Sequence, residues 1–263
     1  MADIDPMRSA LGLLDRIARA RATSVQPVPG GIAVLNSDFP MAHDLNRLII
    51  TTACPPATLA AAADEVLGGA GLGHRQIDVH DLNLGRHLTA GLAEHGYTGS
   101  ADVVMAATGP ALKDPPTAEV LELRVDELDT TERAAVASAE WRQEQPTWDE
   151  ATIDQLGRRI ATFTPPTRAT FFAIRDRAGQ VISRTDLYER DGLAQIEEVM
   201  TDPACQGRGL ASRLVLHALG RARSAGADPV FLIADADDWP RLLYRRLGFS
   251  EVGQILTFRA PPP

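Results

Sequence analysis

Apolar and polar positions in the first part of the chain follow the periods of helices and strands in turn. Residues 6–22 carry Leu11, Leu14 and Ile17 on one helical stripe, whereas residues 75–80 alternate with a period of two. Glycine and proline turns separate these segments. The pattern predicts helices over 6–22, 57–67 and 84–95, and strands over 31–35, 46–52, 75–80 and 102–107.

The second part of the chain shows the same kind of pattern. Two strand-like segments are joined by the short polar turn Asp176–Gln180, which is typical of a hairpin. Pro146 and Pro165 interrupt helical stretches, because proline cannot continue a helix. The pattern predicts strands over 120–125, 170–175, 181–188, 195–201, 230–235 and 255–259, and helices over 131–143, 148–163, 210–224 and 239–247.

The order strand, helix, strand, helix, strand occurs in both parts. In each, the second helix ends at a glycine followed by an aromatic residue, Gly96-Tyr97 and Gly248-Phe249. This agreement favours a duplication, with two unrelated α/β units as the alternative. We interpret the turn-rich residues 108–116 as a linker, which predicts domains at 1–115 and 116–263.

Composition and charge narrow the class of protein. The chain has 263 residues, a net charge of -9 and 44% hydrophobic residues. This is typical of a soluble globular protein and unfavourable for nucleic-acid binding. Neither a spanning apolar stretch nor a basic leader is visible, so we expect a cytoplasmic protein without a membrane partner. Cys54 and Cys205 suggest no disulfide framework.

A glycine-containing loop follows the predicted strand 195–201. Gln206-Gly207-Arg208-Gly209-Leu210-Ala211 leads directly into the helix 210–224. Glycines let backbone N–H groups turn toward an anion, and the start of a helix adds partial positive charge. Arg208 could add a contact at the rim. The sequence lacks the third glycine of a dinucleotide site and the lysine of a P-loop. A pyrophosphate cradle and a plain strand–helix turn are the two interpretations left open.

The spacing Gln206-x-x-Gly209-x-Ala211 resembles the acetyl-CoA-binding motif of the GNAT superfamily of N-acetyltransferases. Residues 243–249, Leu-Tyr-Arg-Arg-Leu-Gly-Phe, are similar to the L-Y-x-x-x-G-F segment near the end of such domains. The resemblance implies an α/β (α+β) fold in which helices flank a mixed, mostly antiparallel sheet. It covers 117–260, and residues 1–115 resemble the degenerate GNAT-like lobe of bacterial tandem members. Acetyl-CoA is the implied cosubstrate.

The same resemblance suggests which residues carry the chemistry. It implies that Glu197 is the base, often acting through water, with Glu198 as the second candidate. Strand alternation predicts that these two side chains lie on opposite faces. The alternative is that either acid only pairs with an arginine such as Arg175 or Arg184. Tyr244 stands at the position of the family's general acid, and its alternative is a packing role.

The coenzyme-binding residues are also carried over from the family. Backbone groups of Val199, Met200 and Thr201 are implied to bind the pantetheine arm, and residues 206–211 the pyrophosphate. Two departures leave roles in doubt. Asp237 stands where many members have a coenzyme-contacting asparagine, and Gln195 stands where other members have a catalytic glutamate.

The first part of the chain lacks both the glycine loop and the tyrosine. Where a cradle would fall, the chain has Cys54-Pro55-Pro56, and proline has no N–H to donate. Leu92 occupies the position that matches Tyr244. Histidines such as His43 and His74 follow no zinc spacing, so we expect no metal. This part of the chain is expected to have a structural role.

These observations predict an acetyl-CoA-dependent N-acetyltransferase acting on a primary amine of a small molecule. A non-catalytic acyl-CoA-binding or regulatory module is the alternative from another class. A mycothiol-forming acyltransferase, also built from two such lobes, is a lesser option. The small-molecule amine is the expected partner, and a homodimer is left open.

Overall fold

All strands that the structure describes belong to one sheet. A computed structural model describes residues 5–107, 120–123, 141–142, 147–162 and 166–262. Within these ranges, eleven strands pair in the order β1-β2-β3-β4-β11-β5-β10-β9-β8-β7-β6. Only β3–β4 and β9–β10 are parallel pairs. The fold is a mixed, mostly antiparallel α/β structure, as predicted.

The N-terminal half follows the predicted pattern with one addition. Its elements are α1 (Pro6–Arg21), β1 (Ser24–Val28), β2 (Gly31–Leu35), η1 (His43–Leu45), β3 (Arg47–Ile50), α2 (Pro56–Ala63), the π-helical turn η2 (Asp64–Gly68), β4 (Arg75–Val79), α3 (Leu82–Glu94) and β5 (Thr98–Ala107). Strand β1 was not predicted from the pattern. It contains Pro27, which an edge strand tolerates because one of its sides needs no hydrogen bonds.

The C-terminal half repeats the order of the N-terminal half. Its elements are β6 (Leu121–Leu123), α5 (Glu150–Arg158), η4 (Arg159–Thr162), β7 (Arg168–Arg175), β8 (Val181–Arg190), β9 (Leu193–Thr201), η5 (Pro203–Cys205), α6 (Leu210–Ser224), β10 (Val230–Asp235), α7 (Pro240–Arg246) and β11 (Phe249–Ala260). The predicted linker at 108–116 and most of the predicted helix 131–143 lie outside the described residues.

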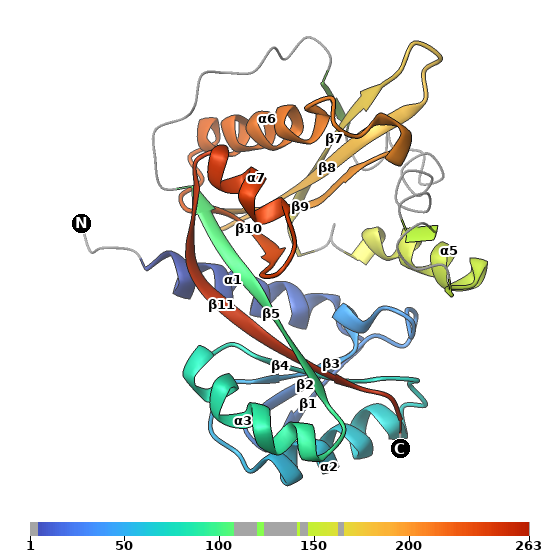
Figure 1. Ribbon diagram of the computed structural model, residues 1–263, viewed down its shortest axis with the longest axis vertical. Helices are drawn as coiled ribbons and strands as arrows, with labels where there is room; N and C mark the ends of the chain where they lie inside the picture. Colours follow the sequence, from blue (N-terminus) through green and yellow to red (C-terminus); the bar gives the residue numbers. More distant parts are fainter. Residues whose placement is uncertain (1–4, 108–119, 124–140, 143–146, 163–165, 263) are drawn as a thin grey trace.

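The last strand of each half pairs with the other half. β11 lies between β4 and β5, and β5 lies between β11 and β10. Figure 1 shows β5 and β11 running side by side through the middle of the molecule. The predicted boundary near residue 115 therefore separates the chain in sequence, whereas the sheet continues across it.

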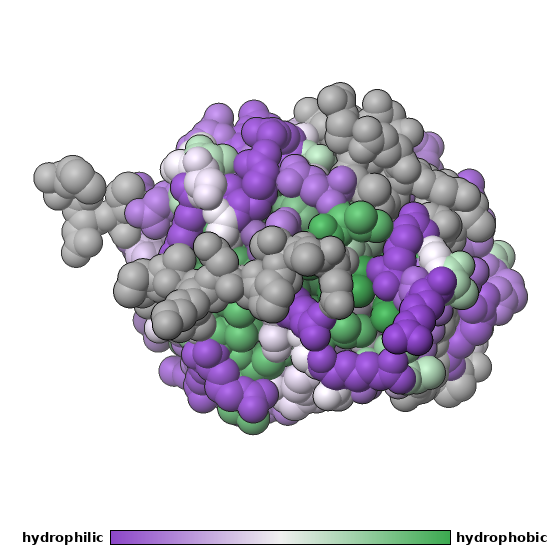
Figure 2. Space-filling model, turned by 90° about the horizontal axis from the view of Figure 1, so that it is seen from above, coloured by the Kyte–Doolittle hydropathy of each residue, from purple (hydrophilic) through white to green (hydrophobic). Residues whose placement is uncertain are grey.

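Helices cover both faces of this sheet. Leu214, Ala218 and Leu219 of α6 pack on the C-terminal part of the sheet, and Leu59 and Leu88 on its N-terminal part. Helix α1 packs against residues of β5 and β10, so it covers the region where the halves join. Seen from above, hydrophobic residues gather toward the middle of the face in Figure 2, with hydrophilic residues around them. None of the helices described is both long and apolar enough for a membrane span.

Candidate active site

Helix α6 begins differently from the other long helices. Aspartate side chains cap α1, α3 and α5: Asp5 accepts from Met7 N at 3.0 Å, Asp81 from Leu84 N at 2.8 Å, and Asp149 from Thr152 N at 2.8 Å. Helix α6 begins at Gly209, and no side chain in the described structure caps it. Because the first N–H groups of a helix need acceptors, this end is suited to an anion.

The conformation of the loop explains its glycines. Gly207 and Gly209 have φ angles of 75° and 74°, in the left-handed region that side chains disfavour. A Cβ at either position would meet nothing within 4 Å. The glycines are therefore required by backbone conformation, and the space beside them is open.

Strands β9 and β10 separate well before the loop begins. They pair only at Ala194 and Gln195 among the described residues, so the later part of β9 has no β10 partner there. The register between β8 and β9 also shifts, and Glu198 has a φ of 55°. A bulge of this kind bends its strand. The separation leaves the β10 side of Val199–Thr201 as an open slot, and backbone groups of these residues are the ones implied by the family resemblance to bind the pantetheine arm.

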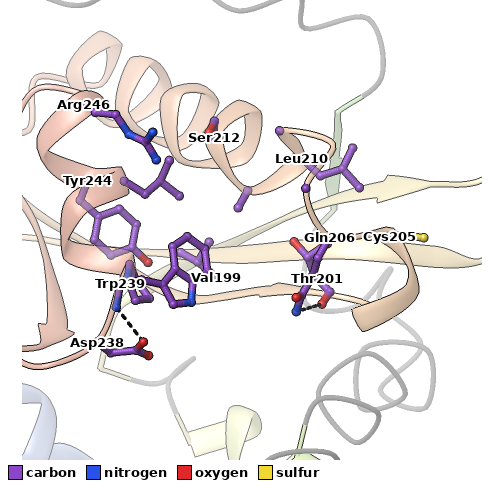
Figure 3. A pocket seen from close by; sticks show the side chains of 15 residues that line it. Val199, Thr201, Cys205, Gln206, Leu210, Ser212, Asp238, Trp239, Tyr244 and Arg246 are labelled. Atoms are coloured by element: carbon purple, nitrogen blue, oxygen red, sulfur yellow. Dashed lines mark hydrogen bonds between the residues drawn. The ribbon is translucent and has the colours of Figure 1, made fainter.

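This slot forms a cavity of about 560 Å³, which we call the α6 cavity. Val199 and Thr201 line it from β9, and the loop and the start of α6 contribute Gln206, Gly207, Gly209, Leu210 and Ala211. Tyr244, Trp239 and Asp238 line the opposite side (Figure 3). Apart from Arg208, the loop residues predicted from the sequence therefore lie with Tyr244 around one cavity.

Tyr244 is held firmly at the edge of the α6 cavity. Its side chain is 7% exposed, and its ring packs edge-on against Phe249 with centroids 6.3 Å apart. Trp239, in contrast, is 60% exposed. Asp238 accepts a hydrogen bond from Trp239 N at 2.7 Å, which fixes the turn before α7.

A second cavity, of about 260 Å³, lies between α1 and the sheet; we call it the α1 cavity. Both halves line it. Its charged residues are Arg21, Asp44, Arg47, Asp78, Asp102, Arg159, Glu197, Glu198 and Arg259. Four arginines and five carboxylates give a nearly balanced lining, which suits a polar ligand.

Glu197 and Glu198 lie on the same side of the sheet, so the prediction of opposite faces was wrong. Both line the α1 cavity. The positive φ of Glu198 interrupts the alternation of β9, and the next side chains change face. The bulge therefore brings two carboxylates together instead of separating them.

The two carboxylates have different surroundings. Glu198 accepts from Arg159 at 2.6 Å and from Arg184 at 2.8 Å. Pairing with Arg184 was the alternative that the sequence left open, and the geometry supports it for Glu198. Glu197 accepts from Gln195 Nε2 instead. Burial, followed by the nearby Glu198 carboxylate, raises the pKa of Glu197 to about 8.

Three residues expected at the coenzyme do not line the α6 cavity. The Met200 side chain packs with Trp141 and Leu156 and lies beside Arg184. Arg208 is exposed and donates to Ala204 O at 3.3 Å. Asp237 lies in the turn after β10, where its N–H donates to Asp235 at 2.7 Å. The geometry gives these side chains no role in the cavity.

Several residues at the site were missed by the sequence reasoning. Trp239 and Asp238 line the α6 cavity from the turn between β10 and α7, outside both family motifs. Asp44 and Arg159 are far from the motifs in sequence, and nothing in the local pattern marks them. Within the described residues, no three His, Cys, Asp or Glu side chains gather as metal ligands. The expectation of no metal stays a prediction.

Comparisons with known proteins find similar sequences and similar folds. The profile of the acetyltransferase (GNAT) family matches residues 133–249. A mycothiol acetyltransferase of Mycobacterium sp. (strain JLS) is 36% identical over 117 residues, which are 42% of this chain and 38% of that protein. The matched segment thus spans about two fifths of that curated relative's length.

Solved structures are similar over almost the whole chain. A GCN5-related N-acetyltransferase from Kribbella flavida has a TM-score of 0.63 at 20% identity, covering 98% of this chain and 96% of that one. A tandem GNAT protein from the clavulanic acid biosynthesis pathway has a TM-score of 0.59 at 13% identity, covering 97% and 96%. At these identities the likeness concerns the fold. Together with the profile match, it supports a GNAT acetyltransferase domain over residues 133–249, within a fold that is similar to that of tandem GNAT structures over almost the whole chain.

Proposed function

We propose that this protein transfers an acetyl group from acetyl-CoA to a primary amine of a small molecule. The observation that carries the proposal is the position of β9 between two cavities. Val199 lines the α6 cavity, and Glu197, two residues earlier, lines the α1 cavity. A donor in the first cavity and an acceptor in the second would meet at this strand.

The α6 cavity fits a coenzyme A diphosphate. The start of α6 has no side-chain cap, and the two left-handed glycines border open space, so backbone N–H groups at this turn could bind an anion. The open edge of β9 could pair with the pantetheine amides as an added strand. In this arrangement the Val199–Thr201 backbone orients the thioester, and the side chains of residues 206–211 contribute little.

The α1 cavity would receive the acceptor. An amine enters as an ammonium ion near neutral pH, and Glu197 adds a negative charge for it to the α1 cavity once it is ionised. A pKa near 8 makes Glu197 a suitable base, because general-base catalysis is most efficient when the pKa of the base lies near the operating pH. Glu197 takes one proton from the ammonium, directly or through water, and the free amine then attacks the thioester carbonyl.

Collapse of the tetrahedral intermediate breaks the carbon–sulfur bond and releases the thiolate of coenzyme A. Tyr244 borders the α6 cavity, so its hydroxyl is suited to protonating this sulfur. The amide nitrogen loses its second proton to bulk solvent or to a base. Glu197 and Tyr244 thus each transfer one proton, and the acetyl group passes directly to the amine without a covalent enzyme intermediate.

The name of the curated relatives supports acetyl transfer but leaves the acceptor open. The match covers 42% of this chain, whereas the α1 cavity takes residues from both halves. The match therefore does not establish that this chain has the same acceptor site as those relatives, and their acceptor has to be tested directly. Mycothiol lacking its acetyl group therefore belongs among the test acceptors, beside polyamines, aminoglycosides, amino acids and peptide N-termini.

The test combines coenzyme binding with transfer. Calorimetry with coenzyme A should detect binding to the wild type and a loss of about tenfold or more for Gly209→Val. Gly226→Val is the matched control, because Gly226 has a φ of 85°, has no atom near its Cβ position, and lies beyond the other end of α6. Its backbone strain is similar, but it is remote from the α6 cavity.

Free-thiol release from acetyl-CoA then measures transfer across the acceptor panel. Release with at least one amine, together with the glycine result, supports the proposed function. Binding of coenzyme A without transfer to any acceptor would favour the alternative, a non-catalytic acyl-CoA-binding module. Equal loss of binding in both glycine variants would overturn the assignment of the cradle.

A further inference from the structure

A loop of the N-terminal half reaches the carboxylate pair of the C-terminal half. Asp44, in η1, binds Arg159 with its Oδ1 at 3.1 Å and Arg21 with its Oδ2 at 3.4 Å. Arg159 in turn donates from its other terminal nitrogen to Glu198 Oε1 at 2.6 Å. A continuous chain of contacts therefore runs from Asp44 to the strand that carries Glu197.

This loop is held in place by contacts independent of the charges. Leu45 and Ala42 pack against Ile153 and Leu156 of the C-terminal half. Met41 N donates to the side chain of Gln155 at 2.7 Å. Because the loop is anchored to α5 in this way, Asp44 is presented to Arg159 at a fixed position.

The contacts divide the two glutamates by function. Arg159 and Arg184 bind one oxygen each of the Glu198 carboxylate, so both of its oxygens are engaged. A carboxylate held between two guanidinium groups is a poor proton acceptor. Glu197 accepts a hydrogen bond from the neutral Gln195 amide and lines the α1 cavity beside it.

We propose that Asp44 is a positioning residue for the active site of the C-terminal half. It holds Arg159 on Glu198, and this leaves Glu197 as the carboxylate that accepts the proton. This inference rests on the proposed function only where it is tested by kinetics. It gives the N-terminal half a defined part in the reaction, beyond covering the sheet.

The charges around Glu197 set the direction of each expected change. Glu198, Arg159, Asp44 and Asp186 act on it directly, and Arg184 and Arg21 act through these. Arg47, Asp78, Asp102 and Arg259 line the rest of the α1 cavity. Removing the Asp44 charge favours ionised Glu197 and lowers its pKa. Removing the Arg159 charge has the opposite effect.

The experiment compares the pH profiles of kcat/KM for the wild type, Asp44→Asn and Arg159→Gln. Activity should rise with pH as Glu197 ionises, with a midpoint near 8 in the wild type. We expect the midpoint to move down by about 0.5–1 pH unit in Asp44→Asn and up by a similar amount in Arg159→Gln. Arg159→Lys, which keeps the charge, should restore most of the wild-type midpoint.

Asp64→Asn is the matched control. Asp64 binds Arg75 at 2.7 Å, its side chain is 47% exposed and its partner 6%, against 40% and 6% for Asp44 and Arg21. The Asp64→Asn variant therefore loses a comparable ion pair in the same half of the chain, at a site remote from Glu197. Its midpoint should not move, and coenzyme A affinity should be unchanged in every variant.

A second measurement separates this inference from the proposed function. Carbon-13 NMR of labelled glutamate carboxyls, with the Glu197 resonance assigned through Glu197→Gln, follows the titration without any turnover. Opposite shifts in Asp44→Asn and Arg159→Gln support the inference even if no acceptor is found. Shifts in the same direction, unchanged midpoints, or an equal shift in Asp64→Asn would overturn it.

Discussion

The two halves of this molecule share one topology and differ at one turn. In the N-terminal half, β3 leads to α2 through Cys54-Pro55-Pro56; in the C-terminal half, β9 leads to α6 through the loop 206–209. Pro55 is the residue before α2, and its ring removes an N–H donor. The second turn instead has two glycines with positive φ angles and open space beside them. A few residues at an equivalent position thus distinguish a turn with two prolines from the turn at which we propose that coenzyme A binds.

The strands before these turns differ as well. β3 pairs with β4 at three successive positions, and His80 N continues the contact to Ile50 O at 3.3 Å. β9 leaves β10 after two positions and bulges at Glu198. The comparison teaches that the cavity comes from broken strand pairing, since the surrounding helices and strands are the same in both halves.

The largest expected effect concerns the carboxylates that β9 has and β3 lacks. Glu197→Gln should lower kcat/KM by about 10²–10⁴-fold, because the amide cannot accept the proton of the ammonium. Coenzyme A binding should stay within about twofold of the wild type, since the α6 cavity is intact. Steady-state thiol release and calorimetry measure the two quantities. Wild-type activity in this variant would remove Glu197 from the mechanism.

A second prediction compares the equivalent positions Tyr244 and Leu92. Tyr244→Phe should lower kcat by about 10–100-fold and leave the unfolding free energy nearly unchanged, because only the hydroxyl is lost. Leu92 is fully buried, so Leu92→Ala should lower the unfolding free energy by about 2–5 kcal/mol. The folded fraction of that variant should keep its wild-type kcat. Urea unfolding and single-turnover rates distinguish the two effects, and a reversed result would contradict the assigned division of roles.

The smallest effect is expected where the halves join. Asp102 of β5 lies opposite Asp235 of β10, and burial, then Asp78 and Asp235, raise the pKa of Asp102 to about 6. A raised carboxyl pKa means that ionisation opposes folding, so this cost is absent below about pH 4 and complete above about pH 6. Asp102→Asn should therefore stabilise the protein by about 1 kcal/mol at pH 7.5 and have little effect at pH 4. Urea unfolding at both pH values tests this; equal effects would contradict the titration.

Much of the fold could be predicted because its signals are local. The helices α1, α3 and α6 and the strands β2, β4 and β10 follow from periodicity, and the repeat follows from their order. The glycine loop could be predicted for the same reason. Positive φ angles favour glycine, and the motif occupies adjacent positions directly before the helix. Strand β1 was missed because Pro27 hides an edge strand, and β11 was predicted too short because its first residues lack alternation.

The sequence by itself determined the elements, their order and the motif at the start of α6, because each depends on neighbouring residues. Tertiary structure decided that β5 and β11 each pair with a strand of the other half. The local sequence pattern does not distinguish these partners from those in the same half. Tertiary structure also decided the bulge that places Glu197 beside Glu198, and the reach of Asp44 to Arg159 across 115 positions. Such contacts depend on where the folded sheet brings distant residues, and no spacing along the chain encodes that placement.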